Sequence, residues 1–172
     1  KELNLLVEYS KKRFEKYDFH NPAIKLKHFI WETFSSHYLE MVKNRAYNED
    51  KNFSKEEQNG ALETLNYCLK ILLETLSPIL PFITFKLYNE LCNQDVHSRP
   101  FPSIKKVNSK LSKEKIAEVN SLVWKSKKDK GISLNSEIKL LQIPSSLESI
   151  SKDLKTMHNA KEVKKGKLKI IL

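Results

Sequence analysis

The fold is decided by the stretch FIWETFSSHYLEMVKNRAY, residues 29–47. Together with the residues before it, this stretch repeats apolar side chains at intervals of three and four, which predicts a long amphipathic helix that begins at Asn21-Pro22. Asparagine can cap a helix, and proline suits the first helical position because it has no N–H to leave unsatisfied. Three aromatic side chains share one side of this helix: Trp31, Phe34 and Tyr38. We expect them to pack between helices, as most aromatic stripes at this spacing do.

Two further helices are predicted on either side of it along the chain. Residues 2–17 place apolar side chains on one face and basic side chains near the end, among them Lys12 and Arg13. Ser54 and Glu57 have the spacing of a capping box, in which the serine oxygen and the glutamate bond back to the backbone of the first turn. The sequence therefore predicts a helix that begins at residue 55 and continues to residue 76.

The stretch SPILPFIT, residues 77–84, marks the end of that helix. Pro78 pushes the residue before it away from helical angles, and Pro81 can open a short fourth helix through Leu91. Because the connections between these helices are short, we expect an antiparallel helical bundle.

The composition changes after residue 92. Residues 93–111 read as a linker or wrapping loop, and residues 112–172 read as a small α+β unit. Its predicted elements are a helix at 112–130 ended by Gly131, a strand at 137–143, a helix at 147–157, and two short strands within 162–172 that turn at Gly166. The predicted fold class is mainly α, with a helical bundle over 1–92 followed by this α+β unit.

The charge of the chain indicates a polyanionic partner. Lys and Arg outnumber Asp and Glu by 31 to 21 over 172 residues, a formal charge of +10. Neutralising phosphates releases counterions, so such an excess favours nucleic acid, although it can also serve solubility alone. No stretch is apolar enough to span a membrane or has the pattern of a signal peptide. Two cysteines without metal or disulfide spacing favour a reduced, cytoplasmic setting. The chain begins with Lys, which suggests a piece of a longer protein.

Catalytic patterns are not found in the sequence. Three isolated glycines cannot form a phosphate-binding loop, and the five histidines lack metal-ligand spacing. No serine or cysteine stands in a recognisable nucleophile motif. We therefore expect no catalytic residue, metal or cofactor in this chain.

The pattern Trp31-x-x-Phe34-x-x-x-Tyr38-x-Glu40-x-x-Lys43 resembles the second helix of the anticodon-binding domain of class I aminoacyl-tRNA synthetases of the valyl and isoleucyl type. The continuation MVKNRAY favours the valyl branch in its archaeal-like form. The runs LNYCLK (65–70) and LSPILPFIT (76–84) are similar to the third helix and following turn of that family, and the Lys-rich run at 124–134 is similar to its later helix. The sequence departs from the family where Glu and Trp are usual, at Phe85 and Tyr88.

The resemblance implies that the chain binds the anticodon loop of a valine-accepting tRNA. Specific reading of RNA concentrates on single-stranded loops, where bases can be stacked and hydrogen-bonded. Phosphate contacts are expected from Lys12, Arg13, Lys43 and Arg45, base contacts from Asn44 and Tyr47, and phosphate contacts outside the loop from Lys125, Lys127 and Lys128. The resemblance also implies a catalytic domain in the same polypeptide, which would use ATP and magnesium to attach valine in the cytoplasm.

Three alternatives remain open from the sequence. The domain could come from an isoleucyl- or leucyl-type synthetase, which binding to the respective anticodon stem-loops would decide. It could be a non-catalytic helical interaction module whose basic surface aids solubility, in which case it would bind no RNA even at low salt. It could also bind nucleic acid without regard to sequence, with equal affinity for scrambled loops and for DNA.

Overall fold

The computed structural model describes residues 1–104 and 107–172. Its contacts divide the chain into two compact units, and each is described by itself. The first unit comprises residues 1–32 and 59–109, and the second unit comprises residues 33–58 and 110–172. Among the described residues, no helix is both long and apolar enough to cross a membrane.

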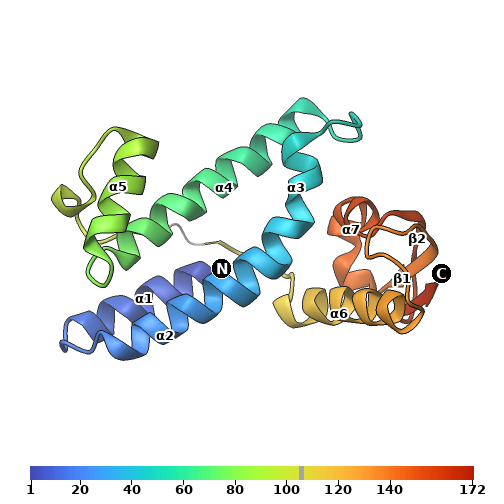
Figure 1. Ribbon diagram of the computed structural model, residues 1–172, viewed down its shortest axis with the longest axis horizontal. Coiled ribbons are helices and arrows are strands. Elements are labelled where there is room, and N and C mark those ends of the chain that lie inside the picture. The colour runs from blue at the N-terminus through green and yellow to red at the C-terminus, as the bar shows by residue number, and fades with distance from the viewer. Residues whose placement is uncertain (105–106) are drawn as a thin grey trace. The chain divides into compact units, whose positions relative to one another are not determined.

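The first unit consists of helices. They are α1 (Glu2–Phe14), α2 (His20–His28), most of α4 (Lys55–Leu76), α5 (Pro81–Cys92) and the short 3-10 helix η2 (Val96–Ser98). Helices α1 and α2 pack side by side (Figure 1). A buried cluster joins α4, α5 and η2 through Leu73, Tyr88 and Val96. The Tyr88 hydroxyl donates a hydrogen bond of 2.7 Å to Glu74, and burial together with this carboxylate raises the pKa of Tyr88 to about 12.

The predicted ends of α4 and the start of α5 are confirmed. The backbone N–H of Ser54 donates to the Glu57 carboxylate over 2.7 Å, and the N–H of Glu57 donates to the Ser54 hydroxyl over 3.2 Å, which is the predicted capping box. Helix α4 ends at Leu76, and Pro81 is the first residue of α5. Local capping chemistry and proline therefore determine these boundaries.

The start of α2 differs from the prediction. Helix α1 ends at Phe14, and Tyr17 has a left-handed φ of 57° that turns the chain. Asp18 takes the part predicted for Asn21, because its carboxylate accepts from the Asn21 backbone N–H at 3.2 Å and from the Asn21 side-chain amide at 2.8 Å. These two bonds, the side-chain one first, lower the pKa of Asp18. A charged acceptor therefore lies near the positive end of the helix, one residue before the N-cap position at Phe19.

The long helix predicted from residue 21 to residue 46 is interrupted by an 11-residue π-helix, η1 (Phe29–Leu39), before it continues as α3 (Glu40–Tyr47). In a π-helix each N–H bonds five residues back, so side chains three residues apart, such as Trp31 and Phe34, no longer share one face. This corrects the prediction that Trp31 packs between helices, because Trp31 is 69% exposed. Phe34 and Tyr38 are half-buried and contact each other with ring centroids 5.7 Å apart.

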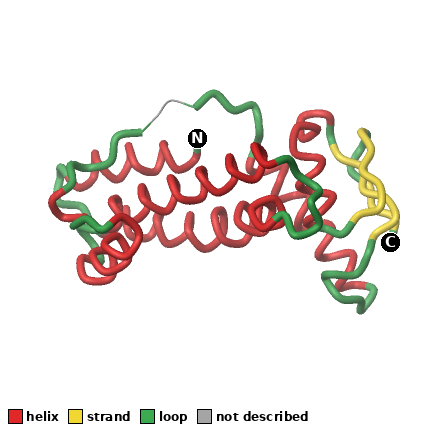
Figure 2. The backbone as a smooth tube through the Cα atoms, turned by 90° about the horizontal axis from the view of Figure 1, so that it is seen from above, coloured by secondary structure: helices red, strands yellow, loops and turns green. Residues whose placement is uncertain are grey.

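The second unit contains a three-stranded sheet, which is drawn in yellow in Figure 2. The order of its strands is β2-β1-β3. Strand β1 (Ile138–Ile143) pairs in parallel with β2 (Ala160–Lys165) and antiparallel with β3 (Lys169–Ile171). The helices of this unit are α3, α6 (Lys113–Asp129), the 3-10 helix η3 (Ser145–Ile150) and α7 (Ser151–Met157). The predicted pair of strands around Gly166 is present. The strands flank β1 instead of pairing with each other, and Gly166 crosses the end of β1 by donating to the Ile143 carbonyl at 3.0 Å.

A polar network lies in the core of the second unit. The Asn120 side chain contacts His158 Nε2 at 2.9 Å and His37 Nδ1 at 3.2 Å. The Trp124 ring stacks on His37 with centroids 5.6 Å apart and meets His158 edge-on. Burial, and secondarily the nearby charge of Lys127, lowers the pKa of His158 to about 4. The network thus joins the π-helix, α6 and the end of α7 through the side chains of His37, Asn120 and His158.

The structure confirms the mainly α fold class with a small α+β unit. The division of the sequence at residues 92 and 112 stays a prediction, since the contacts group residues 33–58 with the C-terminal residues. Within the predicted linker, Val96 and Pro102 are buried, and Phe101 meets Phe14 edge-on. Lys105 and Lys106, which also belong to the predicted linker, lie outside the described residues.

Candidate RNA-binding surface

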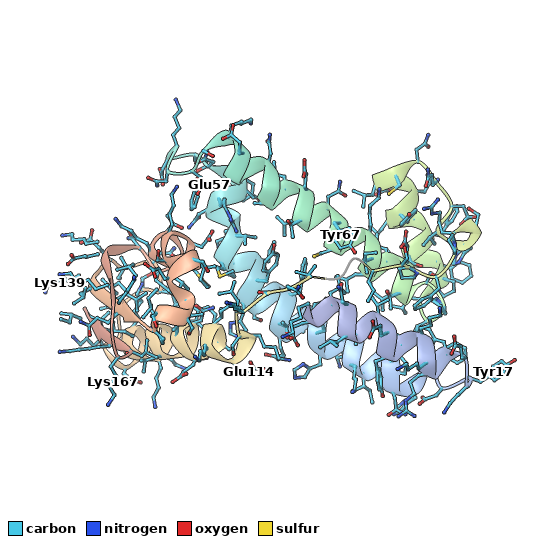
Figure 3. The ribbon with its side chains drawn as sticks, turned by 180° about the vertical axis from the view of Figure 1, so that it is seen from behind. Tyr17, Glu57, Tyr67, Glu114, Lys139 and Lys167 are labelled. Carbon is cyan, nitrogen blue, oxygen red and sulfur yellow. The ribbon has the colours of Figure 1, made fainter. Side chains whose placement is uncertain are left out.

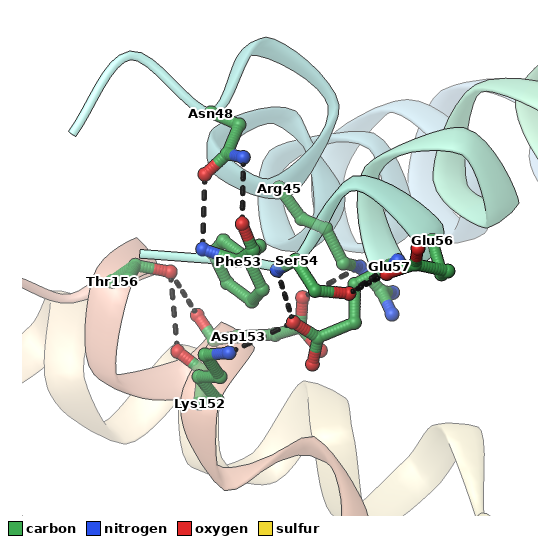
Figure 4. Close-up of polar contacts among 9 residues, drawn as sticks. All are labelled: Arg45, Asn48, Phe53, Ser54, Glu56, Glu57, Lys152, Asp153 and Thr156. Atoms are coloured by element: carbon green, nitrogen blue, oxygen red, sulfur yellow. Dashed lines mark hydrogen bonds and ion pairs between the residues drawn. The ribbon is translucent and has the colours of Figure 1, made fainter. Parts of the chain in front are cut away.

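Four of the predicted contact residues lie together at the end of α3 in the second unit. Asn48 ends this helix with a left-handed φ of 52°. Its side-chain amide accepts from the Phe53 N–H at 2.9 Å and donates to the Phe53 carbonyl at 2.8 Å (Figure 4). Gln58 donates to the carbonyls of Ala46 and Tyr47, so the first turn of α4 is tied to the last turn of α3. The turn from residue 48 to residue 54, called the 48–54 turn below, is therefore held at both ends.

Asn44 and Tyr47 line a cavity of about 70 Å³ beside this turn. The cavity is completed by Asn48, Glu49, Asp50, Asn52, Phe53 and Thr156. Tyr47 is 71% exposed, so its ring can stack on a planar group from outside. Glu49 and Asp50 disfavour a phosphate there, whereas amide groups suit the hydrogen-bonding edge of a base. The structure thus brings the two predicted base readers to one place.

Lys43 and Arg45 differ from each other in their surroundings. Lys43 pairs with Glu40 one turn earlier on the same helix, and both side chains are more than 40% exposed. Such a pair is weak in water and leaves Lys43 able to contact a phosphate. The Arg45 Nε lies 3.1 Å from Asp153 Oδ1, and only 5% of the Asp153 side chain is exposed. The two atoms form an ion pair without hydrogen-bond alignment, and both are buried.

The Arg45–Asp153 pair belongs to a larger set of charges that fixes α7 to α3 and to the start of α4. Lys152 donates to the Glu57 carboxylate at 2.9 Å, and that carboxylate also accepts from Ser54 (Figure 4). The Lys152 ammonium lies 4.5 Å from the centre of the Phe53 ring. Burial raises the pKa of Asp153, whereas Arg45 and Lys152 act in the opposite direction. Lys152 and Asp153 were not predicted from the sequence, because their spacing to Arg45 and Glu57 exists only in the folded chain.

Lys12 and Arg13 lie in the last turn of α1 in the first unit, and both are exposed. Arg13 is 3.4 Å from Asp18, and its guanidinium lies 5.4 Å from the centre of the Tyr9 ring. The structure therefore places Lys12 and Arg13 in a different unit from the cluster at the end of α3.

The three predicted lysines of α6 do not share one environment. Lys125 and Lys128 are exposed, but Lys127 is completely buried. The Lys127 ammonium donates to the Leu134 carbonyl at 2.6 Å and to the His158 carbonyl at 3.0 Å. Burial lowers its pKa. This corrects the prediction that Lys127 contacts phosphate, because its donors are occupied inside the second unit.

We expect Lys127→Met to lower the free energy of unfolding by about 2 kcal/mol, because the buried His158 carbonyl and the partly buried Leu134 carbonyl lose their donor. RNA affinity of the folded protein should stay unchanged. Urea denaturation and RNA titration measure the two effects. Lys128→Met, at the exposed neighbouring position, is the matched control for stability, which it should leave unchanged, whereas its RNA affinity should fall because Lys128 is a predicted phosphate contact. Lost RNA affinity with unchanged stability in Lys127→Met would show that this side chain reaches the surface.

Across residues 1–104 and 107–172, no three His, Cys, Asp or Glu side chains are placed to hold a metal ion together. The described polar groups at the end of α3 are suited to binding and carry no arrangement of nucleophile and base.

Comparison with known proteins gives this arrangement a context. The family described as "Anticodon-binding domain of tRNA ligase" matches residues 1–142. The chain is 34% identical to a valine–tRNA ligase of Pyrobaculum aerophilum over 158 residues, which cover 90% of this chain and 20% of the relative. It is 33% identical to that of Aeropyrum pernix, with the same coverage, and 32% identical to that of Archaeoglobus fulgidus, with 86% and 17% covered. The chain thus spans about a fifth of the length of these relatives, and the predicted resemblance is confirmed.

Proposed function

Since this chain belongs to the family of anticodon-binding domains of tRNA ligases, we propose that it holds the anticodon arm of a valine-accepting tRNA. The match of the family over residues 1–142 carries this proposal. The names of the similar valine–tRNA ligases support valine over isoleucine or leucine as the amino acid. The +10 charge of the chain and the exposed groups at the end of α3 fit an RNA partner.

The reaction itself would take place outside this chain. We propose a catalytic domain in the same polypeptide that uses ATP and magnesium to join valine to the tRNA in the cytoplasm. Binding energy from a remote part of a substrate can be used to orient the reacting groups. The chain would therefore contribute affinity and orientation, and we expect the isolated 172 residues to show no aminoacylation.

Within this proposal the predicted residues have distinct parts. Tyr47 stacks on a loop base, and Asn44 offers its amide to a base edge in or beside the cavity. Lys43 neutralises phosphate near the loop, while Arg45 mainly holds α7 in place. The remaining proposed phosphate contacts are Lys12, Arg13, Lys125 and Lys128.

We expect Tyr47→Ala to weaken binding of the valine anticodon stem-loop about tenfold, because stacking of one base on an aromatic ring contributes roughly 1–3 kcal/mol. The salt dependence of binding should stay the same, since no charge is removed. Fluorescence titration at several salt concentrations measures both quantities. Tyr17→Ala is the matched control, because Tyr17 is 86% exposed in the first unit and has no proposed contact.

A second comparison tests the proposed function itself. The unmodified chain should prefer the valine anticodon loop to the isoleucine loop and to a scrambled loop. Equal affinity for all three would identify a sequence-independent binder, and no binding at low salt would leave a helical interaction module as the explanation.

A further inference from the structure

The positive charge of the chain is concentrated in its C-terminal part. Residues 110–172 contain 15 lysines against seven acidic residues, so they carry +8 of the total charge of +10. The densest run is KEVKKGKLK, residues 161–169, with five lysines and one glutamate. This run forms most of β2 and reaches into β3, and it lies beyond residue 142, where the family match ends. None of the RNA contacts proposed above lies in residues 161–169.

The pairing of the strands sorts these lysines by face. Residues directly opposite each other in neighbouring strands project from the same side of a sheet. Leu141 lies opposite Val163 and Ile170, and this apolar row is turned to the core, since Leu141 is fully buried. The next row has Gln142 in the centre, with Lys164 on one side and Lys169 on the other. Because successive side chains alternate, this second row faces outward.

Lys167 lies at the crossing between β2 and β3, outside the paired residues. The crossing is close to the sheet: a side chain carbon added at Gly166 would lie 3.5 Å from the Gln142 side chain. Lys167 is exposed, and in Figure 3 Lys167 and Lys139 lie on the side of the unit that carries the sheet. We call Lys164, Lys167 and Lys169 the basic sheet face. Lys164 and Lys169 stand two strand spacings apart, about 10 Å.

Acidic neighbours neutralise only part of this surface. Lys164 pairs with Glu162 on its own strand at 3.0 Å, and Lys165 pairs with Glu148 at 2.6 Å. These side chains are all more than 50% exposed, so the pairs are weak and exchange readily with another anion. In the part of the chain that the structure describes, Lys167 and Lys169 form no ion pair. Two exposed ammonium groups are therefore available, one on the outward row at Lys169 and one at the crossing at Lys167.

We propose that the basic sheet face binds the phosphate backbone of the tRNA outside its anticodon loop. This inference rests on the proposed function, which supplies RNA as the partner. Lysine is suited to this contact because its ammonium is a point charge on a flexible side chain, which can bind a phosphate without recognising the base. The contact would add affinity that depends on salt and is indifferent to the anticodon.

Lysines on edge strands can also prevent association between protein molecules, and the test must distinguish this effect from RNA binding. Both β2 and β3 are edges of the sheet, and charged side chains there prevent pairing between sheets of different molecules. If that were their only part, their removal would promote association of the protein and leave RNA binding unchanged.

The test compares Lys167→Gln/Lys169→Gln with Lys27→Gln/Lys86→Gln in the full chain. The control removes the same charge from two exposed lysines of the first unit, on α2 and α5. Each variant is titrated with a valine tRNA transcript and with the same transcript carrying a changed anticodon, over a series of salt concentrations. Size-exclusion chromatography records the association state.

We expect the sheet variant to bind both transcripts about tenfold more weakly at low salt, with the slope of log K against log salt reduced by about 1.5, since two phosphate contacts are lost. The control variant should change either quantity much less. An unchanged affinity and slope for the sheet variant, with or without self-association, overturns the proposal. The anticodon change tests the proposed function separately: if it leaves binding by the unmodified chain unaltered, the anticodon assignment fails while the effect of the sheet lysines can persist. No binding of either transcript by the unmodified chain at low salt overturns both.

Discussion

Arg45→Ala is expected to lower the free energy of unfolding by about 3 kcal/mol, one of the two largest effects predicted for a single side chain here. The reason is the buried carboxylate of Asp153, which faces the Arg45 Nε at 3.1 Å and is only 5% exposed. Without Arg45 this charge stays buried with its strongest compensating neighbour removed. Urea denaturation followed by circular dichroism measures the change.

Two controls make this result interpretable. Arg13→Ala removes the same residue type from an exposed pair with Asp18, and little change in stability is expected. Arg45→Met/Asp153→Leu replaces both charges by apolar groups and should recover most of the loss, because no uncompensated charge remains buried. The Arg45→Ala deficit should also shrink as the pH falls, since protonation removes the charge of Asp153. A deficit that is the same at every pH and persists in the double variant would contradict a charge-burial origin.

The stability of the chain is expected to fall by about 3 kcal/mol between pH 6.5 and pH 4 on account of His158 alone. Burial lowers the pKa of this imidazole from its ordinary 6.5 to about 4. Above pH 6.5 the ring is neutral in the folded and the unfolded chain, so its titration does not change the free energy of unfolding. Between the two pKa values only the unfolded chain takes up the proton, and the equilibrium shifts toward unfolding as the pH falls.

His158→Gln isolates this contribution, since glutamine can still donate toward Asn120 but does not titrate. The difference in unfolding free energy between the unmodified chain and the variant should decrease steadily from pH 6.5 to pH 4. The NMR shift of the His158 ring should titrate near pH 4. The groups around the ring on every packed element are Asn120, Trp124 and Lys127 of α6, with His37 beyond Asn120. Parallel stability curves for the two proteins would show that the ring is protonated in the folded state as easily as in the unfolded one.

The boundaries that were predicted correctly depend on interactions within a few residues. Ser54 and Glu57 satisfy each other's backbone across one turn, and Pro81 opens α5 through its own ring geometry. Gly131 similarly follows the end of α6 with a positive φ of 66°. Because all the residues of each such interaction lie within a few positions of one another, these helix boundaries depend little on tertiary packing.

The misplaced residues depend on contacts between distant segments. The exposure of Trp31 follows from the π-helix, whose altered hydrogen bonding is not encoded in an apolar spacing of three and four. Lys127 is one of four lysines within residues 125–130, a stretch that reads as surface, yet its ammonium is buried and donates to the carbonyls of Leu134 and His158. Asp153 is an ordinary helical acid until Arg45, over a hundred positions earlier, lies against it. The sequence therefore identifies the candidate RNA contacts at the end of α3. Which basic side chains are exposed and which are held in ion pairs or hydrogen bonds inside the unit can be decided only from the fold.

The double hydrogen bond between Asn48 and Phe53 has a consequence for recognition. A loop that is ordered only when its partner arrives must give up conformational entropy at that moment, which weakens the complex. Here the rim of the cavity is already hydrogen-bonded in the free chain, and α7 contributes to it through Lys152 over the Phe53 ring and through Thr156 in the lining. An incoming nucleotide would meet a preshaped edge, so that discrimination comes from how well a base fits and not from how readily the protein rearranges.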